Sequence, residues 1–343
     1  MKKQTERAKP ETVQKSIPQK RAKKDRILVI GAGGQLGREL VRTLVAVYGE
    51  ERVVASDIRE EARGHFPYCQ FEPLNVFANQ RMERTMEENH IGQVYHLAAI
   101  LSADGEIDPQ STWQINLDGL LLVLEACRKL GVEKIFWPSS IAVFGPMSRL
   151  DPSPQFGVKD AQTVYGIAKS AGELWCQYYH KKYGLDVRCL RYPGIIGHGC
   201  LPAGGTTDYA VDIFHHAVQG KPYTCYLSND TKLPMLYMPD AVKAALDLMN
   251  APTKNIKIRT GYNLQGTSFT PIEVYESIRR FYPRFKISFE PDFRQQIAEG
   301  WPRAVDDTEA RKDWGWDPKY DLDYMTEDML DHLARPPKVS LNV

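Results

Sequence analysis

Residues 26–37 read Arg-Ile-Leu-Val-Ile-Gly-Ala-Gly-Gly-Gln-Leu-Gly, and this stretch decides the fold of the chain. Its first five residues form a short apolar run that ends directly on glycine, as expected of a parallel strand buried on both faces. Gly31, Gly34 and Gly37 follow at a spacing of three, and leucines recur at helical spacing from Leu36 to Leu44. A strand, a glycine turn and an amphipathic helix in this order predict the start of a βαβ unit.

Apolar strands and amphipathic helices keep alternating along the next 150 or so residues of the 343-residue chain. The later strands are predicted at residues 53–56, 94–97, 134–137 and 186–190, with a long helix from about Thr163 to Tyr183 before the last of them. This alternation predicts an α/β protein with a doubly wound parallel sheet, a Rossmann fold.

Beyond Tyr192 the chain is punctuated by glycine and proline, which predicts a smaller C-terminal lobe. We therefore expect three parts: a basic flexible tail over residues 1–25, a dinucleotide-binding domain over 26–195 and a mainly substrate-binding lobe over 196–335. A helix that begins at Met238-Pro-Asp240 suggests that a segment near 236–250 returns to the first domain.

Charge and composition exclude several classes of protein. Ten of the 44 Lys and Arg residues, but only three of the 43 Asp and Glu residues, fall within residues 1–26. This basic segment lacks aromatic side chains, so we predict a solvated arm and no nucleic-acid partner. No apolar run approaches the ~20 residues that span a bilayer, so no membrane association is expected.

Cysteine and histidine spacing gives no sign of a metal site. The six cysteines form no Cys-x-x-Cys pair, and the eight histidines lack the spacing of metal ligands. We therefore predict that the cysteines are small buried hydrophobic residues and that the protein holds no metal.

The glycine turn is suited to a dinucleotide. Glycines let the backbone approach a pyrophosphate, and the N-terminus of the following helix offers unpaired N–H groups. Asp57 closes the second strand 20 residues after Gly37, where a carboxylate accepts hydrogen bonds from the adenosine ribose. This favours NAD over NADP, although Arg59 nearby is the type of residue that accommodates a 2′-phosphate.

Tyr165 and Lys169 lie four residues apart and so share one face of a helix. A free tyrosine with a pKa of ~10 is only about 0.1% ionised at pH 7. A neighbouring ammonium and an oxidised nicotinamide both favour the phenolate, so the pair predicts a general base for hydride transfer. Ser139 and Ser140 follow a predicted strand, and Ser140 is our candidate for holding the substrate oxygen. The amide of Asn116 is a candidate for ordering a water linked to Lys169.

Longer segments resemble the extended short-chain dehydrogenase/reductase superfamily, in its nucleotide-sugar epimerase-like branch, over nearly all of residues 26–330. The shared core is carried by His96-Leu-Ala-Ala-Ile-Leu-Ser-Ala103, Pro138-Ser-Ser-Ile-Ala-Val-Phe-Gly-Pro146 and Arg191-Tyr-Pro-Gly-Ile195. In more selective segments the chain is similar to the NAD-dependent L-threonine 3-dehydrogenases, namely Gly205-Thr-Thr-Asp-Tyr-Ala210, Pro291-Asp-Phe-Arg-Gln-Gln-Ile-Ala298, Trp301-Pro-Arg-Ala-Val-Asp-Asp307 and Asp313-Trp-Gly-Trp316.

The resemblance implies two sets of site residues. The substrate is expected to contact Ser102, Ser140, Tyr165 and either Thr206 or Thr207, with Trp301 as a lid contact. The expected NAD contacts are Gly31, Gly34, Gln35, Leu36, Gly37, Asp57, Ile58, Leu74, Asn75, Leu97, Ala98, Ala99, Asn116, Tyr165, Lys169, Tyr192 and Ile195.

The expected reaction is oxidation of L-threonine at C3 by NAD, giving 2-amino-3-oxobutanoate and NADH in threonine catabolism, with Tyr165, Lys169 and Ser140 as catalytic residues. Two alternatives stay open: a nucleotide-sugar 4-epimerase or dehydratase, and a non-catalytic NAD-binding sensor. The resemblance also implies a homodimer formed through the helices that contain Asn116 and Tyr165. The implied location is the mitochondrial matrix in a eukaryote and the cytoplasm otherwise.

Overall fold

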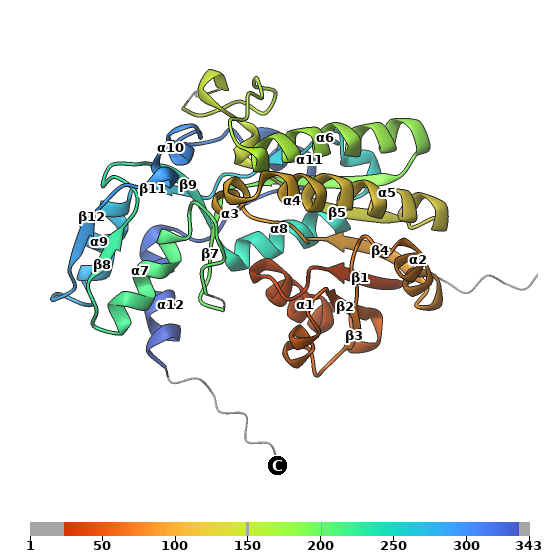
Figure 1. The fold of residues 1–343 in the computed structure, drawn as a ribbon, viewed down its shortest axis with the longest axis horizontal. Coiled ribbons are helices and arrows are strands. Elements are labelled where there is room, and N and C mark those ends of the chain that lie inside the picture. The colour runs from red at the N-terminus through yellow and green to blue at the C-terminus, as the bar shows by residue number, and fades with distance from the viewer. Residues whose placement is uncertain (1–23, 149–150, 200, 336–343) are drawn as a thin grey trace, which may run out of the picture.

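The computed structural model describes residues 24–148, 151–199 and 201–335, and a parallel sheet runs through its larger part (Figure 1). Seven strands form this sheet in the order β10-β6-β5-β4-β1-β2-β3. Their bounds are β1 Arg26–Ile30, β2 Val53–Asp57, β3 Gln70–Pro73, β4 Ile91–His96, β5 Lys134–Ser140, β6 Asp186–Tyr192 and β10 Tyr262–Asn263. The direction of winding reverses between β1 and β4, where such sheets bind ligands beyond the carboxyl ends of the strands. The predicted doubly wound parallel sheet is confirmed.

Helices cover both faces of the sheet and create two separate cores (Figure 1). One core contains residues of α1 (Gln35–Tyr48) and α8 (Met238–Asn250), and the other contains residues of α2 (Asn79–Glu88), α5 (Gly119–Leu130) and α6 (Val164–Tyr183). Because the central strands are buried on both sides, β1 and β2 read as continuous apolar runs. The apolar runs of the sequence therefore identified these strands correctly.

A smaller lobe lies beside the main sheet and has a third core of its own (Figure 1). Its two small sheets are β11-β9-β7 and β12-β8. The strands are β7 Gly194–Ile196, β8 Tyr223–Cys225, β9 Leu233–Tyr237, β11 Thr267–Phe269 and β12 Ile287–Phe289; the helices are α7 Tyr209–Val218, α9 Pro271–Arg279, α10 Phe293–Glu299 and α12 Leu322–Ala334. Helix α11 (Thr308–Trp314) instead contacts β10 and packs in the core of the main sheet. Thr270 caps α9 through a complete capping box with Glu273.

The chain crosses between the two parts more than once. Helix α8 follows β9 directly and packs against α1, while β10 pairs with β6 at the edge of the main sheet. Trp316, from the segment after α11, is also buried in the core beneath α1. The segments that complete the main sheet and its core therefore come from well beyond residue 250.

One helical stretch changes its winding in the middle. Helices α3 (Ser102–Ile107) and α4 (Pro109–Trp113) are followed by a π-helical turn over Gln114–Asp118, which continues directly into α5. The π turn holds Asn116, whose amide donates to the Ile100 carbonyl at 2.9 Å and accepts from the Ile100 N–H at 2.8 Å. Asn116 thereby fixes the backbone that leaves β4.

A buried ion cluster joins α6 to the strands beside it. Glu173, fully buried on α6, accepts from Arg191 of β6 at 2.7 and 2.9 Å and also pairs with Lys159. Ser139 of β5 donates to the same carboxylate at 2.7 Å. Burial works against the ionised form, yet the two cations and their hydrogen bonds hold the pKa of Glu173 below its ordinary value. The cluster fixes α6 against the end of β5.

Three further predictions concern the basic tail, the cysteines and membrane-spanning helices. Residues 1–23 of the basic tail, and Cys200, lie outside the described residues. Among the described cysteines, Cys127, Cys176, Cys189 and Cys225 are buried as expected, whereas Cys69 is half-buried. No helix in the described ranges has the length and apolar character needed to cross a membrane.

Candidate active site

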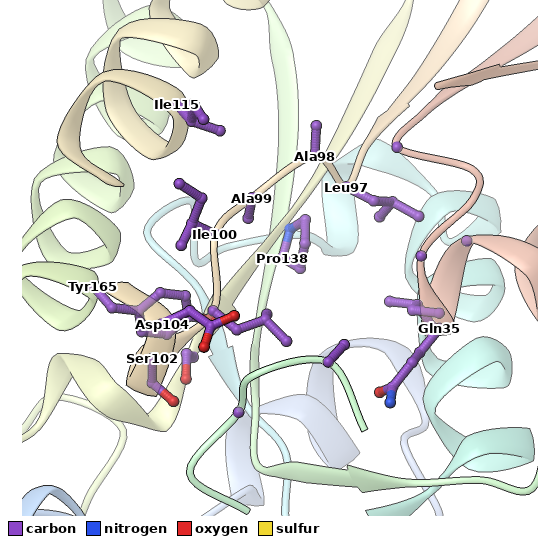
Figure 2. A pocket seen from close by; sticks show the side chains of 18 of the residues that line it. Gln35, Leu97, Ala98, Ala99, Ile100, Ser102, Asp104, Ile115, Pro138 and Tyr165 are labelled. Carbon is purple, nitrogen blue, oxygen red and sulfur yellow. The ribbon is translucent and has the colours of Figure 1, made fainter. Parts of the chain in front are cut away.

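A cavity of about 960 Å³ opens at the carboxyl ends of the central strands, where the winding of the sheet reverses. Every predicted site residue except Asn116 and Thr206 lines it: Gly31, Gly34, Gln35, Leu36, Gly37, Asp57, Ile58, Leu74, Asn75, Leu97, Ala98, Ala99, Ser102, Ser140, Tyr165, Lys169, Tyr192, Ile195, Thr207 and Trp301. Figure 2 shows how side chains from several loops converge on it. Residues scattered over 270 positions thus share one chamber.

The glycine turn forms a tight cradle at one end of the cavity. Gly31 has a φ of +81°, and a Cβ there would lie 2.5 Å from the Ala98 nitrogen. A Cβ on Gly37 would lie 2.5 Å from the Gly31 carbonyl oxygen. No side chain caps α1 at Gly34, so the first N–H groups of this helix are available to an anion. Close backbone approach and a free helix N-terminus fit the pyrophosphate of a dinucleotide.

Asp57 lies at the end of the cavity that is formed by the glycine turn. Its carboxylate accepts from the Gly33 N–H at 2.9 Å and from the Arg59 backbone N–H and Nε at 3.1 and 3.0 Å. Burial raises the pKa of Asp57, but the hydrogen bonds and charge of Arg59 outweigh it and leave the pKa below its usual value. The carboxylate is therefore ionised and able to accept from ribose hydroxyls, while Arg59 is engaged in pairing with it.

Gly33 was not among the predicted residues, although it lines the cavity. A Cβ at this position would lie 2.8 Å from Asp57 Oδ2 and 2.9 Å from Arg59 Nη2. Gly33 therefore allows the turn to reach the end of β2. The signal in the sequence was the pair of consecutive glycines, Gly33 and Gly34.

Tyr165 and Lys169 project from the first turns of α6, whose N-terminus is capped by the Thr163 side chain. Lys169 is buried, and its Nζ donates to the Pro138 carbonyl at 2.7 Å. The same Nζ lies 4.6 Å from the centroid of the Trp137 ring and 5.5 Å from that of Tyr165. The ammonium is thus held beside the phenol by the end of β5.

Burial moves the proton affinities of this pair in opposite directions. It raises the pKa of Tyr165 to about 12, against the effect of a hydrogen bond with Ser140, and it lowers the pKa of Lys169 to about 8. The shift of Tyr165 is the reverse of the one expected from the sequence, because the loss of solvation outweighs its partners. A bound cation beside the phenol would reduce this pKa.

The two serines at the end of β5 face different surroundings. The strand continues to Ser140, three residues beyond the predicted end, so successive side chains point to opposite faces. Both serines line the cavity, but the Ser139 hydroxyl donates to Glu173, whereas Ser140 Oγ accepts from the Ala142 N–H at 3.1 Å. Because the proton of Ser139 is engaged by Glu173, Ser140 is the serine whose hydroxyl can donate to a ligand.

Thr206 and Thr207 also divide their tasks. Thr206 is fully buried, and its hydroxyl lies 3.0 Å from Ser102 Oγ, which in turn accepts from the Thr206 N–H at 3.0 Å. Thr207 lines the cavity. The Ser102–Thr206 pair therefore fixes the loop after β7, and Thr207 is the threonine that faces a ligand. Asn116, bound to Ile100, supports the wall from behind.

Two carboxylates at the same end of the cavity were not predicted. Asp104 and Asp208 line it, and Figure 2 shows Asp104 beside Ser102 and Tyr165. Asp208 accepts from the N–H groups of Ala203 and Gly205 at 2.7 and 2.9 Å. Burial raises the pKa of Asp208; these backbone donors oppose the rise, and Asp104 adds to it.

The remaining charges of the cavity lie elsewhere. Among the described residues that line it, the basic side chains are Arg38, Arg59 and Lys169. Arg38 binds the Gly33 carbonyl oxygen and Arg59 binds Asp57, so both belong to the end formed by the glycine turn. The end formed by Ser102, Asp104 and Asp208 therefore combines hydroxyls with negative charge.

Comparison with known proteins agrees with this arrangement. The NAD dependent epimerase/dehydratase family matches residues 27–264. An uncharacterized epimerase/dehydratase of Staphylococcus aureus is 41% identical over 319 residues, which cover 92% of this chain and 99% of the relative.

Solved structures give closer matches. A GalE-like L-threonine dehydrogenase from Cupriavidus necator in its holo form has 49% identity and a TM-score of 0.86, covering 90% of this chain and 99% of that one. A monomeric L-threonine 3-dehydrogenase from a metagenome has 44% identity and a TM-score of 0.87, covering 90% and 98%. A UDP-glucose 4-epimerase from Thermotoga maritima, at 21% identity and a TM-score of 0.78, shows the shared fold alone. The cradle, the Tyr165–Lys169 pair and the family match agree: the chain belongs to the NAD-dependent epimerase/dehydratase family, whose cofactor is NAD.

Proposed function

We propose that the protein is a dehydrogenase that oxidises L-threonine at C3 with NAD, giving 2-amino-3-oxobutanoate and NADH, as a step of threonine catabolism. Solved structures at 41–51% identity that are described as L-threonine dehydrogenases support this proposal. The observation that carries it in this chain is the charge at the substrate end of the cavity.

Asp104 and Asp208 give that end a negative potential, and Lys169 is the only cation near it among the described lining residues. A free amino acid brings an ammonium group, which a carboxylate attracts and binds through a charge-assisted hydrogen bond. A nucleotide sugar instead brings a diphosphate, which needs basic side chains and would be repelled by these carboxylates. The charge pattern therefore favours an amino acid over the substrates of an epimerase.

The residues at the other end are suited to hold the cofactor. Gly31, Gly34 and Gly37 with the N-terminus of α1 would bind the pyrophosphate, and Asp57 would bind the adenosine ribose. NAD, when bound, accepts the hydrogen that leaves C3 together with its electron pair. The protein supplies the position and the handling of the proton.

Tyr165 is the general base of the proposed reaction. Its Oη would take the proton from the C3 hydroxyl while Ser140 Oγ donates to the same oxygen. Lys169, held by the Pro138 carbonyl, places a positive charge beside the phenol and favours its ionised form. The Thr207 hydroxyl and Ser102 are placed to orient the carboxylate of the substrate, and Asp104 its ammonium.

A substrate comparison tests the proposal. The protein should form NADH from L-threonine with added NAD and should leave UDP-glucose unchanged. Asp104→Asn should raise the KM for L-threonine more than it lowers kcat, because it removes an attraction present before the reaction. Tyr165→Phe should lower kcat by a factor of about 10²–10⁴. Epimerisation of UDP-glucose without added NAD, together with no NADH from L-threonine, would refute the proposal.

We further propose that the protein forms a homodimer through the outer faces of α5 and α6. Several large apolar side chains of α6 are exposed, namely Ile167, Leu174, Trp175, Tyr178 and Tyr183, with exposed fractions from 39 to 60%. Four of the aromatic side chains of α6 also form a contiguous cluster, in which Tyr178 and Tyr179 contact each other and both Trp175 and Tyr183. An apolar surface of this kind on one helix favours burial against a second copy.

A further inference from the structure

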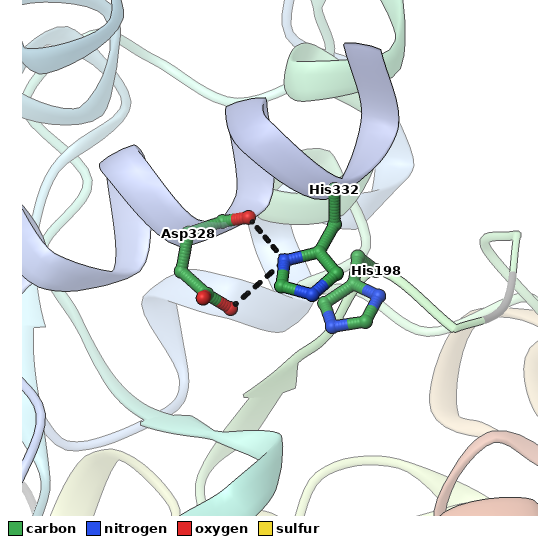
Figure 3. A group of neighbouring side chains, drawn as sticks. All are labelled: His198, Asp328 and His332. Atoms are coloured by element: carbon green, nitrogen blue, oxygen red, sulfur yellow. Dashed lines mark hydrogen bonds and ion pairs between the residues drawn. The ribbon is translucent and has the colours of Figure 1, made fainter. Parts of the chain in front are cut away.

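A group of metal-ligand side chains lies outside the cavity, where His198 meets α12. Asp328 and His332 lie one helical turn apart on α12, and His198 follows β7 by two residues (Figure 3). Each of the three offers a ligand atom, and these atoms all lie within 4.8 Å of one another. The two imidazole rings are stacked, with centroids 4.0 Å apart and planes at 10°.

The hydrogen bonds of this group leave one nitrogen of His332 free to bind a metal. His332 Nδ1 lies 2.9 Å from the Asp328 carbonyl oxygen and 3.5 Å from its Oδ2, so it serves as the N–H side of the ring and leaves Nε2 with a lone pair. Tyr237 donates to the Asp328 carboxylate and fixes its direction.

Two imidazoles and one carboxylate are a ligand set for zinc and related divalent transition metals rather than for calcium or magnesium, which take oxygen ligands. A tetrahedral zinc ion holds its ligand atoms roughly 3.4 Å apart at ordinary zinc–ligand distances. A metal lies in the plane of each imidazole that binds it, so one of the two stacked rings must turn about its side-chain torsions before both nitrogens can point at the same ion. Water would occupy the fourth position.

We propose that His198, Asp328 and His332 form a binding site for a divalent transition metal such as zinc, separate from the active site. The metal would join α12 to the segment that runs from β7 toward α7. Gly194 and Ile195 of β7, and Ala203, Gly205 and Thr207 before α7, line the cavity. The site therefore links the C-terminal helix to both ends of a cavity wall.

Zinc titration of the full chain, prepared without a histidine tag, tests the proposal. Isothermal titration calorimetry should give one zinc ion per chain, and the midpoint of thermal unfolding should rise with zinc. His198→Ala and His332→Ala should each weaken binding at least roughly tenfold, and Asp328→Asn should weaken it less. The three variants should keep the L-threonine activity measured without zinc.

A matched control separates this site from ordinary surface binding. His216 lies on α7, and its Nε2 is 4.0 Å from the carboxylate of Asp212 one turn away. Within the described residues, this pair is not part of a group of three metal-ligand side chains. His216→Ala should leave zinc affinity and the thermal shift unchanged. Zinc binding of equal strength in wild type and in His198→Ala, or an equal loss in His216→Ala, would overturn the proposal, as would no binding to the wild type.

Discussion

At the scale of single residues, the proposed catalytic centre depends on two groups whose proton affinities burial has changed. The pKa of Tyr165 lies near 12 and that of Lys169 near 8, so burial disfavours the charged form of each. Catalysis by this pair needs the tyrosine ionised and the lysine protonated. Burial therefore disfavours the two charged forms, phenolate and ammonium, that the proposed reaction needs.

The first prediction concerns the pH dependence of the reaction. A phenol loses its proton as pH rises, so kcat/KM should increase with pH over the alkaline range that Tyr165 titrates. Ser140→Ala removes the hydrogen bond that lowers this pKa, so its rising limb should move to higher pH and kcat should fall. Ser139→Ala, whose hydroxyl binds Glu173 instead, should leave the limb in place. Equal pH profiles for the two variants would contradict this assignment.

The second prediction concerns stability and Lys169. The pKa of a free lysine is 10.5, whereas that of folded Lys169 is about 8. Between these values the unfolded chain binds the proton that the folded chain releases, so the free energy of unfolding rises with pH. From pH 7 to pH 9 the wild type should gain about 1 kcal/mol relative to Lys169→Met. Urea unfolding at both pH values measures this difference, and a constant difference would show that Lys169 keeps an ordinary pKa.

At the scale of elements, the site depends on how closely α6 packs on β5. Gly172 makes this contact possible, since a Cβ there would lie 2.4 Å from Trp137 Cη2 and 3.0 Å from a Leu120 methyl carbon. The Glu173 cluster fixes the same helix to β5 and β6. The packing of α6 on β5 and β6 therefore sets the positions of Tyr165 and Lys169, although Gly172 and Glu173 take no part in the proposed chemistry.

The third prediction tests this packing. Gly172→Ala should lower the free energy of unfolding by about 1–3 kcal/mol, because the added methyl group has no room against the Trp137 ring. It should also lower kcat, since α6 must move and carry Tyr165 and Lys169 with it. Gly64→Ala, where a Cβ meets no atom within 4 Å, is the matched control and should change neither. Denaturant unfolding and NADH formation give the two measurements.

The sequence predicted those elements whose order of apolar and polar residues reflects which of their faces are buried. The central strands were found because both of their faces are buried, and the long helix predicted from about Thr163 to Tyr183 agrees with α6. It missed β3, a short edge strand with polar Gln70 and Glu72, and β10, which has only two residues. Such strands owe their place to neighbours rather than to their own composition.

The sequence predicted those site residues that short-range spacing or motif order connects, and missed those that only the folded loops bring together. Helical spacing joined Tyr165 to Lys169, and motif order joined them to the glycine cradle. The choice between Thr206 and Thr207 depended on a hydrogen bond to Ser102, 104 residues away. Asp104 meets Asp208, and His198 meets His332, only through the path of the loops, which residue spacing does not record.

At the scale of the whole molecule, the fourth prediction is that two copies of the chain associate through the exposed apolar surface of α6. Trp175→Glu places a charge in that surface, so it should convert a dimer to a monomer in sedimentation velocity at micromolar concentration. Val47→Glu, which changes an exposed side chain of α1, is the control and should leave the oligomeric state unchanged. A similar solved structure is described as a monomeric L-threonine 3-dehydrogenase. If the wild type sediments as a monomer in the same way, the dimer proposal is refuted.

The π turn at Gln114–Asp118 has a consequence for how this chain can change in length. A π turn holds one residue more than the α-helical turn it replaces. Deleting a single residue there would restore an ordinary helix that turns through nearly the same angle, because the π turn fits its extra residue into one turn. The apolar side of α5 would therefore still face β4. The change would be confined to the turn itself, where Asn116 binds Ile100.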